Sequence, residues 1–100
     1  MIELSQLEEI LRSYPGFSEM EVRIKSMNPQ KKDSFWATSI KRYLTNGHSS
    51  LNQEGTIYLN LKDIEDDEKL IEAVAHEASH LLDDEVLPKV IIEFIKEKLQ

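Results

Sequence analysis

Apolar residues recur at helical spacing at the start of the chain. From position 4 to 14 they fall every three or four residues, so that one face of an amphipathic helix would be buried. Ser5 and Glu8 stand three residues apart and predict a capping box near its start. Pro15 and Gly16 favour a turn and predict its end. We therefore expect a short helix over Leu4–Tyr14.

Three later stretches alternate apolar and polar residues with the period of a β-strand. They are Glu21–Met27, Phe35–Leu44 and Thr56–Leu61. In the first stretch, Val22 and Ile24 share one face. Polar segments rich in Asn, Gly and Ser separate the strands. Three strands at this spacing predict a small antiparallel or mixed sheet.

The C-terminal part of the chain returns to helical spacing. Asp63–Leu82 begins with clustered acidic residues, which suit the positive end of a helix, and continues with an apolar stripe. Pro88–Leu99 has a second apolar stripe, and proline is favoured in the first turn of a helix. The connection Asp83–Leu87 is short, so we expect the two helices to pack antiparallel.

These elements predict an α+β fold in one domain spanning residues 1–100, because a chain of 100 residues has the size of a single domain. With 40% hydrophobic and 31% charged residues, the composition is that of a globular protein. The predicted order is an N-terminal helix, a three-stranded sheet and two helices.

Charge and cysteine content exclude several functions. The formal net charge of −7 argues against a nucleic-acid partner, which would need clustered Lys and Arg. Without cysteine there is no disulfide and no thiolate metal ligand. No apolar run is long enough to span a membrane, and no secretory signal is recognised at the start. We expect a cytoplasmic protein.

The third helix contains the motif His-Glu-x-x-His at His76, Glu77 and His80. Two histidines four residues apart lie on one helix face, where both rings can bind one zinc ion. The glutamate between them is then placed to take a proton from the water that the metal activates. The alternative is a pair of surface histidines without a common ligand.

A catalytic zinc site needs a third protein ligand. Glu93 is predicted for this role, because an antiparallel pair of helices would bring it level with the second histidine. Glu97 follows one turn later and would accept a hydrogen bond from a ligating histidine. The alternatives are Asp84, if the motif helix continues for another turn, and more weakly Asp83 or Glu85. Both glutamates are also compatible with solvated charges that pair with nearby lysines.

Four other residues have side chains of functional interest. His48 lies in a predicted loop, where a solvated histidine is the more common case. Trp36 is expected in the core or in a groove wall. Tyr43 and Tyr58 could each donate a hydrogen bond to an oxyanion, and the sequence does not favour either.

The element order, the His76–His80 motif and the acidic pair Glu93 and Glu97 together resemble the minigluzincins, a family of minimal metallopeptidase-like proteins of the gluzincin clan. The resemblance implies His76, His80 and Glu93 as zinc ligands and Glu77 as general base. Glu97 stands where many larger gluzincins have aspartate.

This resemblance implies a zincin-like fold, in which Leu4–Tyr14 backs the site and Thr56–Leu61 forms the edge of the cleft. It further implies a zinc metalloendopeptidase that hydrolyses peptides or proteins, and a latent, zymogen-like form of the isolated protein. We expect the substrate to add as an extended strand along Thr56–Leu61. One alternative function is a zinc-binding module that recognises peptides or proteins without cutting them. Another is an acidic adaptor whose motif is accidental.

Overall fold

A computed structural model describes residues 2–26, 37–43 and 53–100. Its helices and strands are α1 (Leu4–Arg12), β1 (Met20–Ser26), β2 (Ala37–Tyr43), β3 (Gln53–Leu59), α2 (Asp67–Leu81) and α3 (Pro88–Leu99). Two single 3-10 turns, Pro15–Phe17 and Leu61–Asp63, flank the strands. The predicted α+β architecture is confirmed: an N-terminal helix, a three-stranded mixed sheet and two C-terminal helices.

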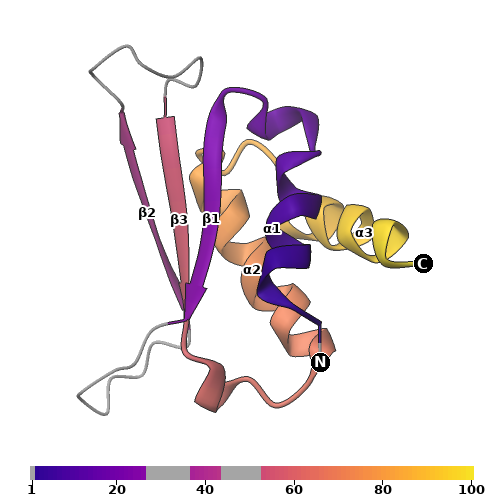
Figure 1. The fold of residues 1–100 in the computed structure, drawn as a ribbon. Helices are drawn as coiled ribbons and strands as arrows, with labels where there is room; N and C mark the ends of the chain where they lie inside the picture. The colour runs from indigo at the N-terminus through magenta and orange to yellow at the C-terminus, as the bar shows by residue number, and fades with distance from the viewer. Residues whose placement is uncertain (1, 27–36, 44–52) are drawn as a thin grey trace.

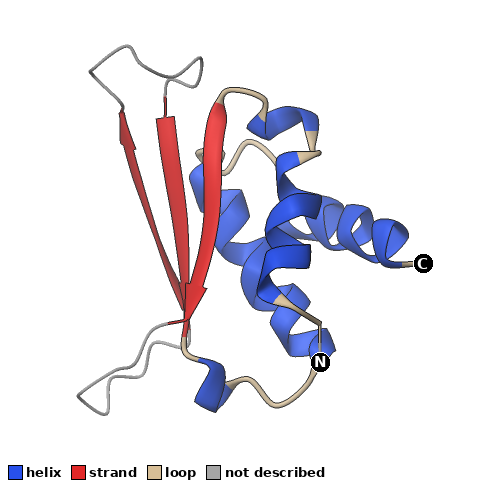
Figure 2. Ribbon diagram, in the orientation of Figure 1, coloured by secondary structure: helices blue, strands red, loops and turns tan. Residues whose placement is uncertain are grey.

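The strands form one sheet in the order β1-β3-β2. β1 runs parallel to β3, and β2 runs antiparallel to it. α1 and α2 pack against the same face of this sheet, and α3 packs against these two helices on the side away from the strands (Figures 1 and 2). Met27, Phe35, Trp36 and Leu44, which were predicted at strand ends, lie outside the described residues.

The expectation that a substrate adds as a strand along Thr56–Leu61 is wrong. β3 covers Gln53–Leu59, and its two edges are paired with β1 and β2. Ile57 and Leu59 are fully buried, and a strand with such side chains is most stable in the centre of the sheet. Leu61 begins the following 3-10 turn instead of continuing the strand.

The core lies between the inner face of the sheet and the three helices. The predicted face of β1 is confirmed, because Val22 and Ile24 are buried while Arg23 and Lys25 are exposed. Each helix adds fully buried side chains to the same cluster: Leu7 and Leu11 from α1, Leu70 and Val74 from α2, and Ile91 and Ile95 from α3.

Gly55 allows the end of α2 to approach β3 closely. A β-carbon at this position would lie 2.6 Å from Sδ of Met20 and 2.9 Å from Cδ1 of Leu81. Both neighbours are buried core residues, so a larger residue would have to displace them. The glycine in the strand is therefore explained by close packing.

The start and end of α1 differ from the prediction. The residue at the N-cap is Glu3, and no side chain caps this end, so the predicted capping box of Ser5 and Glu8 is wrong. The helix ends at Arg12, and Tyr14 precedes the next 3-10 turn.

Glu8 and Arg12 of α1 instead bind the outer edge of β1. The Glu8 carboxylate accepts a hydrogen bond from the Ile24 N–H at 2.9 Å, and Nε of Arg12 donates to the Val22 carbonyl at 2.9 Å. The two side chains also form an ion pair of 2.9 Å with each other. They satisfy main-chain groups that a neighbouring strand would otherwise pair.

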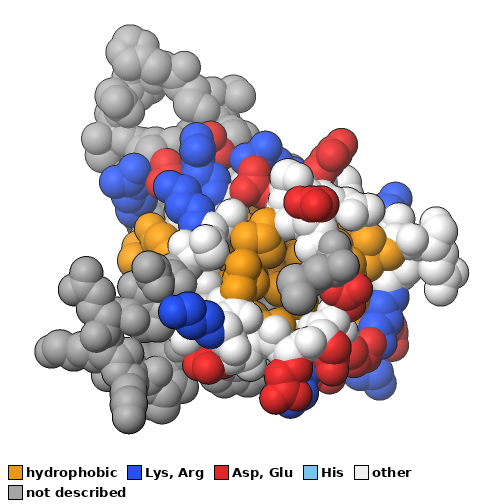
Figure 3. All heavy atoms as spheres, turned by 60° about the horizontal axis from the view of Figure 1, so that its bottom comes forward, with side chains coloured by type: hydrophobic (Ala, Val, Ile, Leu, Met, Phe, Trp, Pro, Cys, Tyr) orange, Lys and Arg blue, Asp and Glu red, His pale blue; other side chains and the backbone are white. Residues whose placement is uncertain are grey.

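α2 begins later than predicted, at Asp67. Asp66 is the N-cap, and its carboxylate accepts a hydrogen bond from the Lys69 N–H at 2.8 Å. Asp63 lies in the preceding turn, where it accepts a hydrogen bond from the Asn60 side chain. Acidic side chains gather on this side of the molecule, next to a central group of hydrophobic side chains (Figure 3). Their charge suits the positive end of the helix.

α3 has the predicted bounds, and its packing is also as predicted. Lys96, near its C-terminal end, forms an ion pair of 2.6 Å with Glu68, near the start of α2. The two helices therefore run antiparallel. Phe94 packs edge-on against Tyr14, with ring centroids 5.0 Å apart, which connects α3 to the end of α1.

No helix in the described part of the chain has the length and apolar character needed to cross a membrane.

Candidate metal centre

The motif residues lie in the last two turns of α2, which is the predicted helical context. Glu77 is buried, with 6% of its surface exposed, whereas His76 and His80 are exposed. The apolar neighbours of the motif, Val74, Ala75, Ala78 and Leu81, are buried. These apolar neighbours belong to the core cluster, whereas both imidazoles reach solvent.

The two imidazoles face each other through their outer nitrogens. Nε2 of His76 lies 3.2 Å from Nε2 of His80, and the ring planes are nearly perpendicular at 89°. Two nitrogen ligands of a tetrahedral zinc ion, each at about 2.0–2.1 Å, lie roughly 3.3 Å apart. The spacing of this donor pair therefore fits a zinc ion, and imidazole is a ligand that zinc prefers.

The inner nitrogen of His80 has a different neighbour. Its Nδ1 lies 3.0 Å from Oδ1 of Asp84, four residues further along the chain. Asp84 was an alternative ligand if α2 continued through it, but the helix ends at Leu81. The aspartate instead reaches the histidine from the loop that follows.

This loop has an unusual main-chain conformation. Asp83 and Asp84 have φ values of 56° and 60°, in the left-handed region that residues other than glycine rarely adopt. The Asp84 N–H donates to the Ser79 carbonyl and the Asp83 N–H to the His80 carbonyl, both at 3.0 Å. Ser79 also donates through its hydroxyl to the Val86 carbonyl at 2.6 Å. The two main-chain bonds close the helix end in a Schellman arrangement, and the Ser79 hydroxyl ties the following loop to the helix.

The predicted third ligand is not brought to the histidines. Among the described residues, no group of three or more His, Asp or Glu side chains could hold a metal ion. The pairing of Lys96 with Glu68 gives a physical reason. This ion pair marks the level at which the two helices meet. Glu93 lies about 4.5 Å from that level along α3, whereas His76 lies about 12 Å from it along α2. Glu93 is therefore not level with His76. Glu93 is exposed in α3, and its role as a ligand stays a prediction.

Glu97 is also exposed in α3, and no hydrogen bond or ion pair between described residues joins it to a histidine. Its predicted role beside a ligating histidine likewise stays a prediction. The residue that does contact a histidine nitrogen in this way is Asp84. In the sequence, the separation of four residues between His80 and Asp84 indicated that the two side chains could lie close together. This spacing alone suggested that Asp84 is a metal ligand, not that it contacts a histidine nitrogen.

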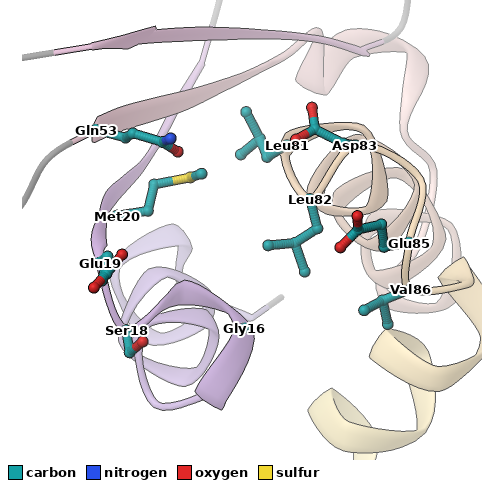
Figure 4. A pocket seen from close by; sticks show the side chains of 10 residues that line it. All are labelled: Gly16, Ser18, Glu19, Met20, Gln53, Leu81, Leu82, Asp83, Glu85 and Val86. Atoms are coloured by element: carbon teal, nitrogen blue, oxygen red, sulfur yellow. The ribbon is translucent and has the colours of Figure 1, made fainter.

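Asp83 and Glu85, the weaker alternatives for the third ligand, border a cavity beyond the end of α2. The cavity has a volume of about 250 Å³ and is lined by Gly16, Ser18, Glu19, Met20, Gln53, Leu81, Leu82, Asp83, Glu85 and Val86 (Figure 4). Asp83 also forms an ion pair of 2.6 Å with Lys41 of β2. The motif residues His76, Glu77 and His80 do not line this cavity.

The remaining candidates are not placed at the motif. Tyr58 alternates with the buried Ile57 and Leu59 along β3, so it lies on the sheet face opposite the helices and cannot serve an oxyanion beside α2. His48 and Trp36 lie outside the described residues, as does the side chain of Tyr43.

No protein-family model, curated protein or solved structure matches the chain.

Proposed function

We propose that the protein is a zinc-dependent metalloendopeptidase of gluzincin type with a zincin-like fold. The observation that carries the proposal is the distance of 3.2 Å between the Nε2 atoms of His76 and His80. Two facing imidazole nitrogens at this separation match two ligands of one tetrahedral ion. Both lie within a His-Glu-x-x-His sequence on a helix, which is the context that the zincin chemistry requires.

Each residue of the motif has a distinct role in this proposal. His76 and His80 would hold the ion, with Glu93 proposed as the third ligand. A zinc ion lowers the pKa of its water and polarises a carbonyl group. Glu77 accepts the proton of the attacking water and passes it to the nitrogen of the leaving amine. The position of Glu77 in the motif, directly after the first histidine, supports this role, because it is the position of the general base in His-Glu-x-x-His sequences.

The proposed substrate is an extended peptide or protein segment. Since β3 is paired on both edges, the segment would lie along β2, the edge strand that packs against α2. Lys41 of β2 supports this placement, because its Nζ lies 3.5 Å from the Leu81 carbonyl and 2.6 Å from the Asp83 carboxylate. These contacts hold β2 beside the end of the motif helix.

The test is hydrolysis of a quenched fluorescent peptide library by zinc-loaded protein. Glu77→Gln should retain zinc and lose cleavage, because the amide cannot accept the proton. Glu72→Gln is the matched control, since Glu72 is an exposed glutamate on the same helix, and it should cleave like the wild type. A chelator should abolish cleavage. Cleavage that survives in Glu77→Gln would contradict the mechanism.

A second function is favoured by one observation. Among the described residues, no third acidic or histidine side chain completes a group with the histidine pair that could hold a metal ion, so the ion could be held for binding rather than for catalysis. In that case the protein is a zinc-binding module that recognises peptides without cleaving them. Wild-type protein that binds both zinc and library peptides but cleaves none of them would favour this second function.

A further inference from the structure

The two ring nitrogens of His80 have different partners, and this decides where the proton of the neutral ring resides. Nδ1 lies 3.0 Å from the Asp84 carboxylate, and Nε2 lies 3.2 Å from Nε2 of His76. An ionised carboxylate can only accept hydrogen bonds. The neutral imidazole of His80 must therefore carry its proton on Nδ1, which leaves a lone pair on Nε2.

The same contact determines the proton of the second ring. Because Nε2 of His80 is an acceptor, the hydrogen bond between the rings requires a proton on Nε2 of His76. When both rings are neutral, these two contacts require the histidines to be opposite tautomers. His80 is ready to bind a metal, whereas the proton of His76 must first move from Nε2 to Nδ1 through solvent, without net proton release.

We propose that Asp84 is a positioning residue for the metal site, which fixes the tautomer and the orientation of His80 through Nδ1. The proposal rests on the zinc site proposed above and adds to it a residue from the loop after α2. A carboxylate that holds the far nitrogen of a ligating histidine raises the basicity of the ligand and restricts its rotation.

Asp84 is not placed as a ligand of the same ion. Within the His80 ring, Nδ1 and Nε2 point in diverging directions. Asp84 contacts Nδ1, whereas Nε2 faces His76. A metal ion held between the two Nε2 atoms would lie on the other side of the His80 ring. The carboxylate and the ion therefore act on opposite nitrogens of the same side chain.

The main chain after α2 explains how the carboxylate reaches His80. Asp83 and Asp84 both have left-handed conformations, which the helix-closing bonds from their N–H groups to His80 and Ser79 maintain. Aspartate tolerates this conformation better than most residues, although glycine would adopt it without strain. Aspartate at position 84 is therefore less favourable for the backbone than glycine, but it supplies the carboxylate that contacts His80.

The two neighbouring aspartates allow a matched experiment. Both have left-handed φ values, but Asp84 contacts His80 while Asp83 pairs with Lys41. Asp84→Gly and Asp83→Gly each relieve the strained backbone and remove one carboxylate, so both variants should fold. Asp84→Asn is the conservative variant, because its side-chain oxygen can still accept from Nδ1.

The first readout is the tautomer of each histidine in the metal-free protein, measured by long-range ¹H–¹⁵N correlation spectra of neutral imidazoles. Wild type should show His80 protonated on Nδ1 and His76 on Nε2, and zinc should convert only His76. Asp84→Gly should give a mixture at His80, Asp84→Asn should restore the wild-type tautomer in part, and Asp83→Gly should resemble wild type. His80 protonated on Nε2 in the metal-free wild type would overturn the proposal.

The second readout is zinc affinity, measured by competition with a chelating dye. Loss of a residue that supports a ligand typically lowers metal affinity by about 10- to 100-fold. The side chains of His80 and Asp84 are 49% and 68% exposed, so solvent weakens the contact and we expect the lower end, about tenfold, for Asp84→Gly. Equal affinities of Asp84→Gly and Asp83→Gly would overturn positioning. Failure of wild type to bind zinc would overturn the proposed function, while the tautomers of the metal-free protein still decide the role of Asp84.

Discussion

Glu8→Ala tests whether α1 protects the outer edge of β1. The substitution removes the acceptor of the Ile24 N–H, which is bonded at 2.9 Å, and the partner of Arg12. Ile24 itself is buried, with 6% of its surface exposed, so water can replace the carboxylate only in part. The Glu8 side chain is 24% exposed, which places the hydrogen bond between a surface and a core interaction.

The expected cost follows from these two contacts. A hydrogen bond to a charged group contributes about 1.5–3 kcal/mol to stability, and an i,i+4 ion pair on a helix adds about 0.3–0.5 kcal/mol. With partial replacement by water, we expect Glu8→Ala to lower the free energy of unfolding by about 2 kcal/mol. For a domain of this size the melting temperature should fall by about 8 °C.

Urea unfolding followed by circular dichroism measures this change. Glu8→Gln is the informative comparison, because its side-chain carbonyl still accepts from Ile24 while the ion pair is lost, and it should cost about 0.5 kcal/mol. Glu9→Ala, at an exposed position of the same helix, should change stability by less than about 0.5 kcal/mol. If Glu8→Ala and Glu8→Gln destabilise equally, the hydrogen bond to the β1 edge contributes nothing and the reasoning fails.

Three further changes test other contacts. Asp66→Ala should cost about 1 kcal/mol in urea unfolding, because it removes the N-cap of α2, and a neutral result would refute the cap. Gly55→Ala should cost about 1 kcal/mol, the low end of overpacking, because Met20 and Leu81 line a cavity into which they can shift; a stabilised variant would contradict the close contact. Chelation of zinc-loaded protein should lower the melting temperature, since a ligand bound only to the native state stabilises it; an unchanged value would argue against a native zinc site.

The local pattern of the sequence was sufficient for most elements of the fold. Pro88 and the apolar spacing after it predicted α3 with its observed bounds, and alternation predicted the buried face of β1. The order of the strands was not predictable in this way, because it depends on pairing between distant segments. β3 is the central strand, although a substrate strand had been expected to add along its sequence.

The predicted capping box failed for a similar reason. Ser5 and Glu8 have the spacing of such a box, but Glu8 finds the Ile24 N–H, 16 residues away, as its partner. When a side chain can form a hydrogen bond either within its own helix or with a distant strand, sequence spacing alone does not predict which partner it takes. The tertiary contact replaces the local one, and Glu3 becomes the N-cap without a side-chain bond.

At the candidate site, helical periodicity predicted that His76 and His80 lie on the same face of the helix. In the structure their Nε2 atoms are 3.2 Å apart. The position of Asp84 was beyond such a prediction. It depends on two consecutive left-handed residues after the helix, a conformation that the sequence Asp-Asp does not signal as Gly or Asn would. The spacing of four residues suggested Asp84 only as a metal ligand, and its contact with Nδ1 of His80 was found only in three dimensions.

The most direct test of the central claim, that His76 and His80 bind one zinc ion, is the zinc content per chain measured by mass spectrometry after zinc loading and dialysis. His48→Ala is the matched control, because it removes the third of the three histidines and leaves the motif intact. Wild type and His48→Ala should each retain about one zinc ion per chain, whereas His76→Ala and His80→Ala should lose it. Zinc-free wild type, or zinc retained equally by all four proteins, would contradict the account.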